Sequence, residues 1–202
     1  ICEHLLHQIK KSKSMNKKVI GQYILLSTLS KVLGLSLISA TYMTFLLKNG
    51  LNLFEANLVN VVFYLVLFIS EIPTGAFADV YGRKKSYVIS CLLISIGNFI
   101  YGLSHGFWGF ALAESFSAVG MTFATGAFQA WLVDSLKHHG DNSPLQPIFS
   151  KAQIYSQMGS IAGAVIGSYL ATINQTWPWF AIGFGMLFVM CLAQIIMKEE
   201  YF

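Results

Sequence analysis

Residues 75–85 read Gly-Ala-Phe-Ala-Asp-Val-Tyr-Gly-Arg-Lys-Lys, and they lie between two long apolar stretches. The segment combines an acid, a turn glycine and three consecutive cations, and it is far too short to be a domain. The flanking stretches, Leu51–Ala78 and Ser86–Ser104, are each long enough to cross a bilayer, which takes about 20 residues in a helix. A short charged hairpin between two membrane spans is an anchor or a gating element, and the spacing here favours a gating element.

The composition is that of a membrane protein. Hydrophobic residues make up 55% of the chain and charged residues 11%, against about 25% charged in an ordinary soluble domain. The cysteines, Cys2, Cys91 and Cys191, lie far apart, so we expect neither a disulfide framework nor a metal site. The sequence contains no His-Glu-x-x-His and no Gly-x-Ser-x-Gly motif, and we therefore expect no enzyme and no cofactor.

We predict an all-α polytopic membrane protein with six transmembrane helices. The predicted spans are Val19–Leu47, Leu51–Ala78, Ser86–Ser104, Phe107–Leu136, Ile148–Ile173 and Trp177–Met197. The connections at 48–50, 105–106 and 174–176 are very short, so the spans should form three antiparallel hairpins. The bundle then covers residues 19–197, between a tail at 1–18 and an end at 198–202. The run from Met15 resembles a natural start, so we expect residues 1–14 to be an extension or an artefact.

The basic residues predict the orientation in the membrane. One side of the predicted bundle carries nearly all of them: Lys10, Lys11, Lys13, Lys17, Lys18, Arg83, Lys84, Lys85, Lys137, Lys151 and Lys198. The other side carries Lys48, and Lys31 lies within the first span. Cytoplasmic loops are enriched in Lys and Arg, so we expect both termini in the cytoplasm and no nucleic-acid partner.

The spacing of the hairpin residues suggests separate roles for them. Gly75, Asp79 and Arg83 are four residues apart, so on a continuous helix they share a face and the acid pairs with the arginine. Gly75 would permit the close approach of another helix, and Gly82 would allow the turn. A simple positive anchor needs the Arg83-Lys84-Lys85 run but has no use for the glycine and the acid at these offsets.

The pattern Gly-x-x-x-Asp-x-x-Gly-Arg-Lys-Lys after a second transmembrane helix resembles the signature loop of major facilitator superfamily transporters. The stretches at 71–74 (Glu-Ile-Pro-Thr) and 129–134 (Gln-Ala-Trp-Leu-Val-Asp) strengthen the resemblance, which covers residues 19–197. One position departs from the pattern, because Val80 stands where a basic residue is usual. In the family, the loop acid and arginine form a latch with an acid at the end of helix 4. The resemblance assigns these roles to Asp79, Arg83 and Asp134, with Gly75, Gly82 and Lys84 completing the gating motif.

The resemblance also implies an architecture and a function. Family members typically have twelve helices in two halves, each a 3+3 inverted repeat, so this chain looks like an amino-terminal half in the inner (plasma) membrane. We expect a secondary active transporter that moves a small molecule by alternating access, with proton-coupled efflux as one candidate mode. Its partners would be the substrate, protons, the lipid bilayer and a second six-helix half. The alternative is a six-helix fragment or membrane interaction protein without transport of its own.

Polar residues inside the spans are candidates for a substrate or proton pathway, because lipid exposure of charged groups is costly. The candidates are Lys31, Glu71, Glu114, Gln129 and Gln157. Lys31 either works in transport or pairs with one of the two acids. Glu114 falls where many family members carry an arginine, so that arginine's role cannot be transferred to it, but a glutamate can still exchange protons. For either glutamine, hydrogen bonding between helices is the alternative.

The fifth span carries Gly159, Gly163 and Gly167 at four-residue spacing. One face of this helix is therefore smooth, and another helix can pack closely against it. Antiporters of the family have a Gly-Pro-x-x-Gly-Gly core here, but the matching Gly-Ala-Val-Ile-Gly-Ser at 163–168 lacks the proline and the last glycine. The stretch predicts close packing and gives no support to antiport.

Overall fold

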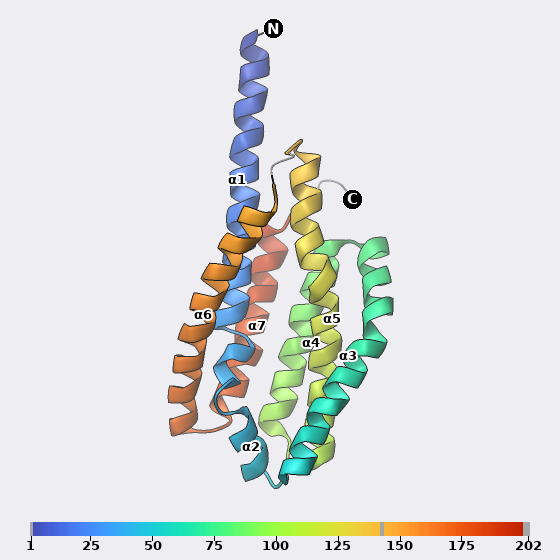
Figure 1. The fold of residues 1–202 in the computed structure, drawn as a ribbon, viewed down its shortest axis with the longest axis vertical. Coiled ribbons are helices and arrows are strands. Elements are labelled where there is room, and N and C mark those ends of the chain that lie inside the picture. The colour runs from blue at the N-terminus through green and yellow to red at the C-terminus, as the bar shows by residue number, and fades with distance from the viewer. Residues whose placement is uncertain (1, 142–143, 200–202) are drawn as a thin grey trace.

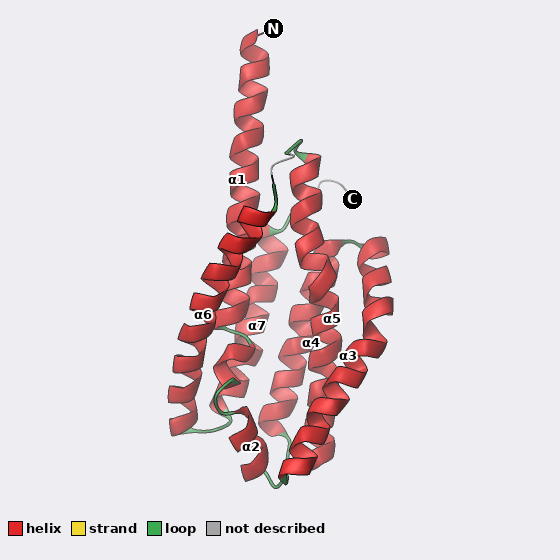
Figure 2. Ribbon diagram, in the orientation of Figure 1, coloured by secondary structure: helices red, strands yellow, loops and turns green. Residues whose placement is uncertain are grey.

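The computed structural model describes the backbone of residues 2–141 and 144–199, and the side chains of residues 15–141 and 144–199. Every regular element in these ranges is helical (Figure 2). The elements are α1 (Cys2–Val32), the 3₁₀ helix η1 (Leu35–Ile38), α2 (Tyr42–Lys48), α3 (Leu53–Tyr81), α4 (Arg83–Leu103), α5 (Gly106–His138), α6 (Gln146–Ile173) and α7 (Trp177–Ile196). The expected all-α class is confirmed.

The long helices form one bundle with two groups (Figure 1). In the first group, α5 packs against both α3 and α4. In the second group, α6 packs against α1 and η1. Helix α7 joins the groups, because it packs mainly on α4 and also contacts α1 and α6.

The chain termini described here, the α3–α4 corner and the α5–α6 connection all lie at one end of the bundle (Figure 1). We call it the basic end, since it carries Arg83, Lys84, Lys137 and Lys198. The opposite end carries the short connections that follow α2, α4 and α6, and Lys48. The candidate spans therefore run antiparallel in succession, as the short connections predicted. Lys10, Lys11 and Lys13 lie outside the described side chains.

Five helical stretches in the described part of the chain are long and apolar enough to cross a membrane. They are Met15–Lys48, Leu53–Tyr81, Arg83–Leu103, Gly106–His138 and Trp177–Ile196. Helix α6 lies where the fifth of six spans was predicted and has 28 residues, but it is too polar to count among the five. Lys151, Gln153 and Gln157 near its start, with its serines and glycines, lower its hydropathy.

The first predicted span is wrong in one respect, because it is not a continuous helix. Helix α1 ends at Val32, and η1 and α2 follow in place of further α-helical turns. At the break, the Ser36 hydroxyl donates to the Lys31 carbonyl, and the Ser39 hydroxyl donates to the Ser36 carbonyl over 2.8 Å. The Lys31 carbonyl thus gains a side-chain donor at the break, and the Ser36 carbonyl gains a second donor beside the Ser39 backbone N–H. Such bonds reduce the cost of unpaired backbone groups at membrane depth.

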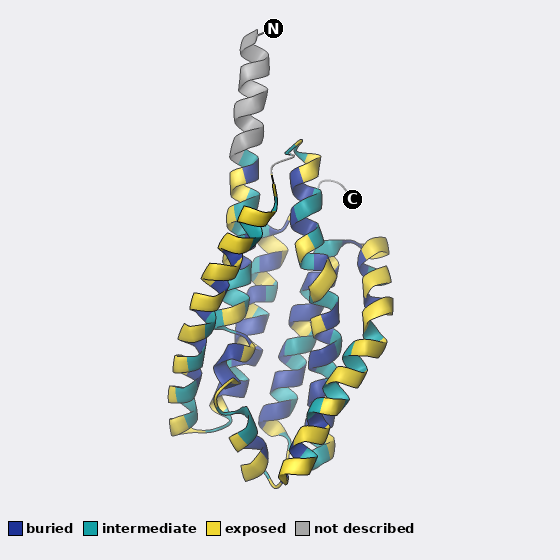
Figure 3. Cartoon of the chain, viewed as in Figure 1, coloured by how far each residue is buried: buried dark blue, intermediate teal, exposed yellow. Residues whose placement is uncertain are grey.

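The buried share of a helix depends on its position in the bundle (Figure 3). Half of the apolar stretch in α4 is buried, against 11% of that in α3. Large apolar side chains of α3 and α6 point away from the bundle, among them Phe68, Ile72, Ile161 and Tyr169. These faces need lipid or another protein surface to cover them.

Candidate functional site

The predicted latch residues lie together at the basic end. Arg83 Nη2 is 2.7 Å from Asp79 Oδ1, and Arg83 Nε is 3.7 Å from Asp134 Oδ2. The arginine side chain is 23% exposed, whereas those of Asp79 and Asp134 are 64% and 37% exposed. One guanidinium therefore connects the end of α3 and the start of α4 to the last turns of α5. Ion pairs this open to water contribute about 0–1 kcal/mol each.

Gly82 alone separates α3 from α4, and its backbone conformation favours glycine. Its φ of 103° lies in the region that side chains disfavour. A Cβ at this position would also lie 2.6 Å from Glu199 Oε2, at the flexible end of that side chain, which would have to shift. The turn at this corner thus favours the glycine that the motif predicted.

Glu199 is a member of the site that sequence reasoning missed. Its Oε1 accepts the backbone N–H of Lys84 over 2.7 Å, so the carboxylate caps the start of α4, where N–H groups lack partners and the helix dipole is positive. The Lys84 ammonium donates to the Gln194 carbonyl of α7 over 2.7 Å. The segment after α7 is thereby fastened to the α3–α4 corner. The available signal was an acidic pair, at 199–200, ending the last span opposite an Arg-Lys-Lys run.

Gly75 does not have the role predicted for it within this chain. A Cβ added there would meet no atom of the described residues within 4 Å, and the residue is exposed. The close approach of another helix at Gly75 is therefore not made by any described segment. Lys84 likewise contacts α7 and not the two aspartates.

Two of the pathway candidates, Lys31 and Gln129, are exposed side chains that line an open cavity of about 340 Å³ between α1, α5 and α6, with residues of α4 also in its wall. Gln153 and Ser156 of α6 also line it, whereas Gln157, one position further, is exposed elsewhere. Among the described residues, Lys31 forms no ion pair with Glu71 or Glu114. The expected pairing of this lysine with an acid is thus not present in this structure.

Glu114 lies outside the cavity, in a buried polar cluster toward the opposite end. Its Oε1 accepts hydrogen bonds from the hydroxyls of Tyr42 at 2.8 Å and Tyr101 at 2.7 Å. The Tyr42 hydroxyl also lies 3.3 Å from Asn60 Oδ1. These four residues, which we call the Glu114 cluster, connect α2, α3, α4 and α5. Glu71, by contrast, is exposed on α3.

The three glycines of α6 are buried and face α1 and η1. A Cβ at Gly159 would lie 2.9 Å from Val32 Cγ2, and one at Gly163 would lie 2.8 Å from the Val32 carbonyl oxygen. A Cβ at Gly167 would collide with the backbone of Leu37 in η1. The smooth face of α6 therefore lies against the end of α1 and the broken segment that follows it.

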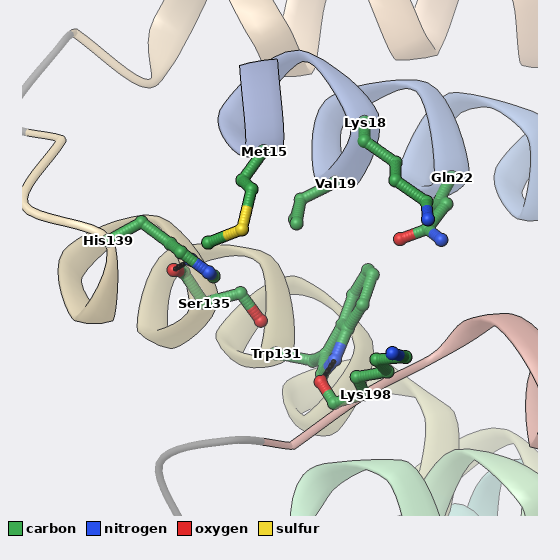
Figure 4. A pocket seen from close by; sticks show the side chains of 8 residues that line it. All are labelled: Met15, Lys18, Val19, Gln22, Trp131, Ser135, His139 and Lys198. Carbon is green, nitrogen blue, oxygen red and sulfur yellow. Dashed lines mark hydrogen bonds between the residues drawn. The ribbon is translucent and has the colours of Figure 1, made fainter. Parts of the chain in front are cut away.

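A smaller pocket of about 130 Å³ opens at the basic end between α1 and α5 (Figure 4). Met15, Lys18, Gln22 and Trp131 are among its lining residues. Trp131 Nε1 donates to the Lys198 carbonyl over 3.0 Å, which holds the segment after α7 over α5. None of the predicted site residues lines this pocket. No group of three His, Cys, Asp or Glu residues in the described ranges could hold a metal ion.

Comparison with known proteins gives consistent matches. The family model of the Major Facilitator Superfamily matches residues 24–201. An uncharacterized transporter of Buchnera aphidicola is 23% identical over 174 residues, which are 86% of this chain and 41% of that protein. A siderophore iron transporter of Saccharomyces cerevisiae is 24% identical over 164 residues, covering 80% of this chain and 25% of that protein. A vacuolar membrane amino acid uptake transporter of Schizosaccharomyces pombe is 27% identical over 105 residues, covering 51% and 17%. The chain thus spans less than half the length of these relatives.

Proposed function

This chain belongs to the major facilitator superfamily of membrane transporters, and we propose that it forms the amino-terminal half of a secondary active transporter. It moves a small molecule by alternating access between the two sides of the membrane. The observation that carries the proposal is the Arg83 cluster, made of Asp79, Arg83 and Asp134, which joins three helices at the basic end. The cavity lined by Lys31 and Gln129 provides this half's share of the substrate site.

The Arg83 cluster acts as a latch that favours one of the two access states. Its ion pairs are partly exposed, and each contributes about 1 kcal/mol or less. An interaction of this size can be made and broken in every cycle, yet a change of about 1.4 kcal/mol in the balance of two states shifts their ratio tenfold. Following the family resemblance, we assign the latched state as the outward-facing one.

A second six-helix half completes the transporter. The chain spans 41% of the Buchnera protein and 25% of the yeast protein. The exposed apolar faces of α3 and α6 and the empty space beside Gly75 are surfaces that such a half would cover. We place the basic end in the cytoplasm of a cell with the bundle in the plasma membrane, because Lys and Arg gather at that end.

Proton-coupled export is the finer part of the proposal, and Glu114 is the residue that we assign to the proton. Its carboxylate holds the Tyr42 hydroxyl at the start of α2. A proton on the carboxylate would weaken this acceptor and release α2 from the Glu114 cluster. Glu71 is the second candidate, because it lies on α3 one turn before Gly75.

The test measures access to the cavity in the complete protein, with all native cysteines replaced and a single cysteine at Gln129. An impermeant maleimide is applied to right-side-out and to inside-out vesicles. Alternating access predicts labelling from both sides. Asp79→Asn should increase cytoplasmic labelling several-fold at the expense of outside labelling, whereas the charge-conserving Asp79→Glu should retain most of the original ratio. Labelling from one side alone, unchanged by Asp79→Asn, would contradict the proposal.

A further inference from the structure

The cavity between α1, α5 and α6 has an unbalanced charge. Lys31 lines it, and no Asp or Glu does so among the described residues. The other polar lining groups are neutral amides and hydroxyls, including Gln129, Gln153 and Ser156. The two acids predicted as pathway candidates are elsewhere, since Glu114 is held by tyrosines and Glu71 is exposed on α3. The positive charge of the cavity wall therefore has no counter-charge among the described residues.

The position of Lys31 is fixed by the break in the first span. It lies in the last turn of α1, and its carbonyl accepts the Ser36 hydroxyl. The negative end of the α1 dipole favours a cation here, but this effect is small compared with the cost of a lysine at membrane depth. Charged residues at such depth face a cavity or pair with a partner. Lys31 faces the cavity and is exposed to it, so an anion that enters the cavity would meet its ammonium.

The cavity also has a wall of stacked aromatic side chains. The Phe128 ring stacks on both Tyr23 and Tyr87, with ring centroids 4.7 Å and 4.4 Å apart. All three residues line the cavity. Ser90, another lining residue, has a buried hydroxyl without a hydrogen-bond partner among the described residues. An apolar planar group and an oxyanion would thus each meet a suitable surface.

We infer that the substrate is a small organic anion, a carboxylate attached to an aromatic or similarly planar apolar body, and that Lys31 is its counter-charge. The inference rests on the proposed transport function, because it assigns the cavity to the substrate. The competing arrangement is a permanent ion pair between Lys31 and an acid supplied by the second half. In that case the lysine would stabilise the fold and would not distinguish between ligands.

Three probes that differ in charge but share a ring system separate these arrangements: 2-naphthoate, 2-naphthamide and 2-naphthylmethylammonium. Their dissociation constants are measured on the purified complete protein by calorimetric titration. We expect naphthoate to bind at least roughly tenfold more tightly than naphthamide. Lys31→Met should remove this preference, with a loss of roughly tenfold in the affinity for naphthoate. Lys31→Arg should retain most of it, and Lys151→Met, an exposed lysine on α6, should leave it unchanged.

Equal dissociation constants for naphthoate and naphthamide, including binding of neither, would overturn the inference. So would a preference for naphthoate that survives in Lys31→Met. A permanent ion pair predicts in addition that Lys31→Met lowers the melting temperature of the ligand-free protein. Transport is tested separately by naphthoate counterflow in proteoliposomes. Selective binding without counterflow would count against the transport function, while the anion preference of the cavity would stand.

Discussion

The Arg83 cluster and the Glu114 cluster place acids in opposite surroundings. At the basic end, Asp79 is 64% exposed and pairs with an arginine that water can also reach. Toward the opposite end, Glu114 is 8% exposed and is held by two tyrosine hydroxyls from different helices. Water can replace any contact that the Arg83 cluster loses, whereas a buried hydroxyl that loses its acceptor stays unpaired. The comparison indicates a rigid interior toward the opposite end and an adjustable network at the basic end.

The seam between η1 and α6 belongs to the rigid part, and its disruption should have the largest effect. Gly167→Ala would drive a Cβ into the backbone of Leu37, and we expect a loss of at least about 3 kcal/mol in the free energy of unfolding. The measurement is unfolding of the purified protein in mixed detergent micelles. Gly126→Ala in α5, where a Cβ meets nothing within 4 Å, is the matched control and should be neutral or stabilising. Similar results for the two variants would show that the seam is not tightly packed.

Glu114→Ala should have the next largest effect. It removes the acceptor of the buried Tyr101 hydroxyl and of the partly buried Tyr42 hydroxyl, and a buried hydroxyl left unpaired costs about 1–3 kcal/mol. Because Tyr42 and Tyr101 lie 3.3 Å apart and can bond to each other, we expect a total loss of roughly 2–3 kcal/mol.

Glu114→Gln, which keeps an acceptor oxygen, should lose less, and exposed Glu71→Ala should change the melting temperature little. If Glu71→Ala and Glu114→Ala destabilise equally, the contrast between rigid and adjustable regions fails. For the proton role of Glu114, transport in the complete protein should lose its dependence on the pH gradient in Glu114→Gln while substrate still binds.

Much of this arrangement followed from the sequence, because its signals are local. Apolar runs of sufficient length predicted the helices, and the four-residue spacing placed Asp79 beside Arg83. Contacts between distant segments were harder to predict. Glu199 accepts the backbone N–H of Lys84, which is far away in the sequence. The sequence around an acidic residue does not indicate which helix end that residue caps. Trp179 is only 2% exposed and stacks on Tyr101 with the ring centroids 4.0 Å apart, a contact between α7 and α4 that no local pattern in the sequence indicates.

The break in the first span was also not predicted from the sequence, because it depends on packing against another helix. The apolar composition of this span is continuous, so the sequence predicted one helix from 19 to 47. Gly34 is compatible with a helix or a break, and the choice depends on α6, whose glycines let the bent segment approach. The tyrosine partners of Glu114 were missed for a related reason, since Tyr42 reaches the carboxylate only because α2 begins after the break.

Glu199→Ala tests the link between the segment after α7 and the α3–α4 corner. Loss of a helix cap costs about 0.5–2 kcal/mol, and we expect about 1 kcal/mol here, seen as a lower melting temperature. Glu199→Gln keeps an oxygen that can accept the Lys84 N–H and should restore about half of the loss or more. If Glu199→Gln is as destabilising as the alanine variant, the charge at the helix end matters and the hydrogen bond does not.

Asp79→Asn should have the smallest effect on stability and is the sharpest test of the comparison. The exposed pair with Arg83 contributes at most about 1 kcal/mol, so the melting temperature should stay nearly constant. Losing this pair in only one of two access states of similar free energy would shift their balance by a few tenths of a kcal/mol to about 1 kcal/mol. The ratio of the two states would then change by roughly two- to fivefold. Paired measurements of melting temperature and of maleimide labelling at Gln129→Cys separate the two effects. A latch predicts changed labelling at unchanged stability, whereas a structural brace predicts that both change together and a simple anchor predicts that neither does.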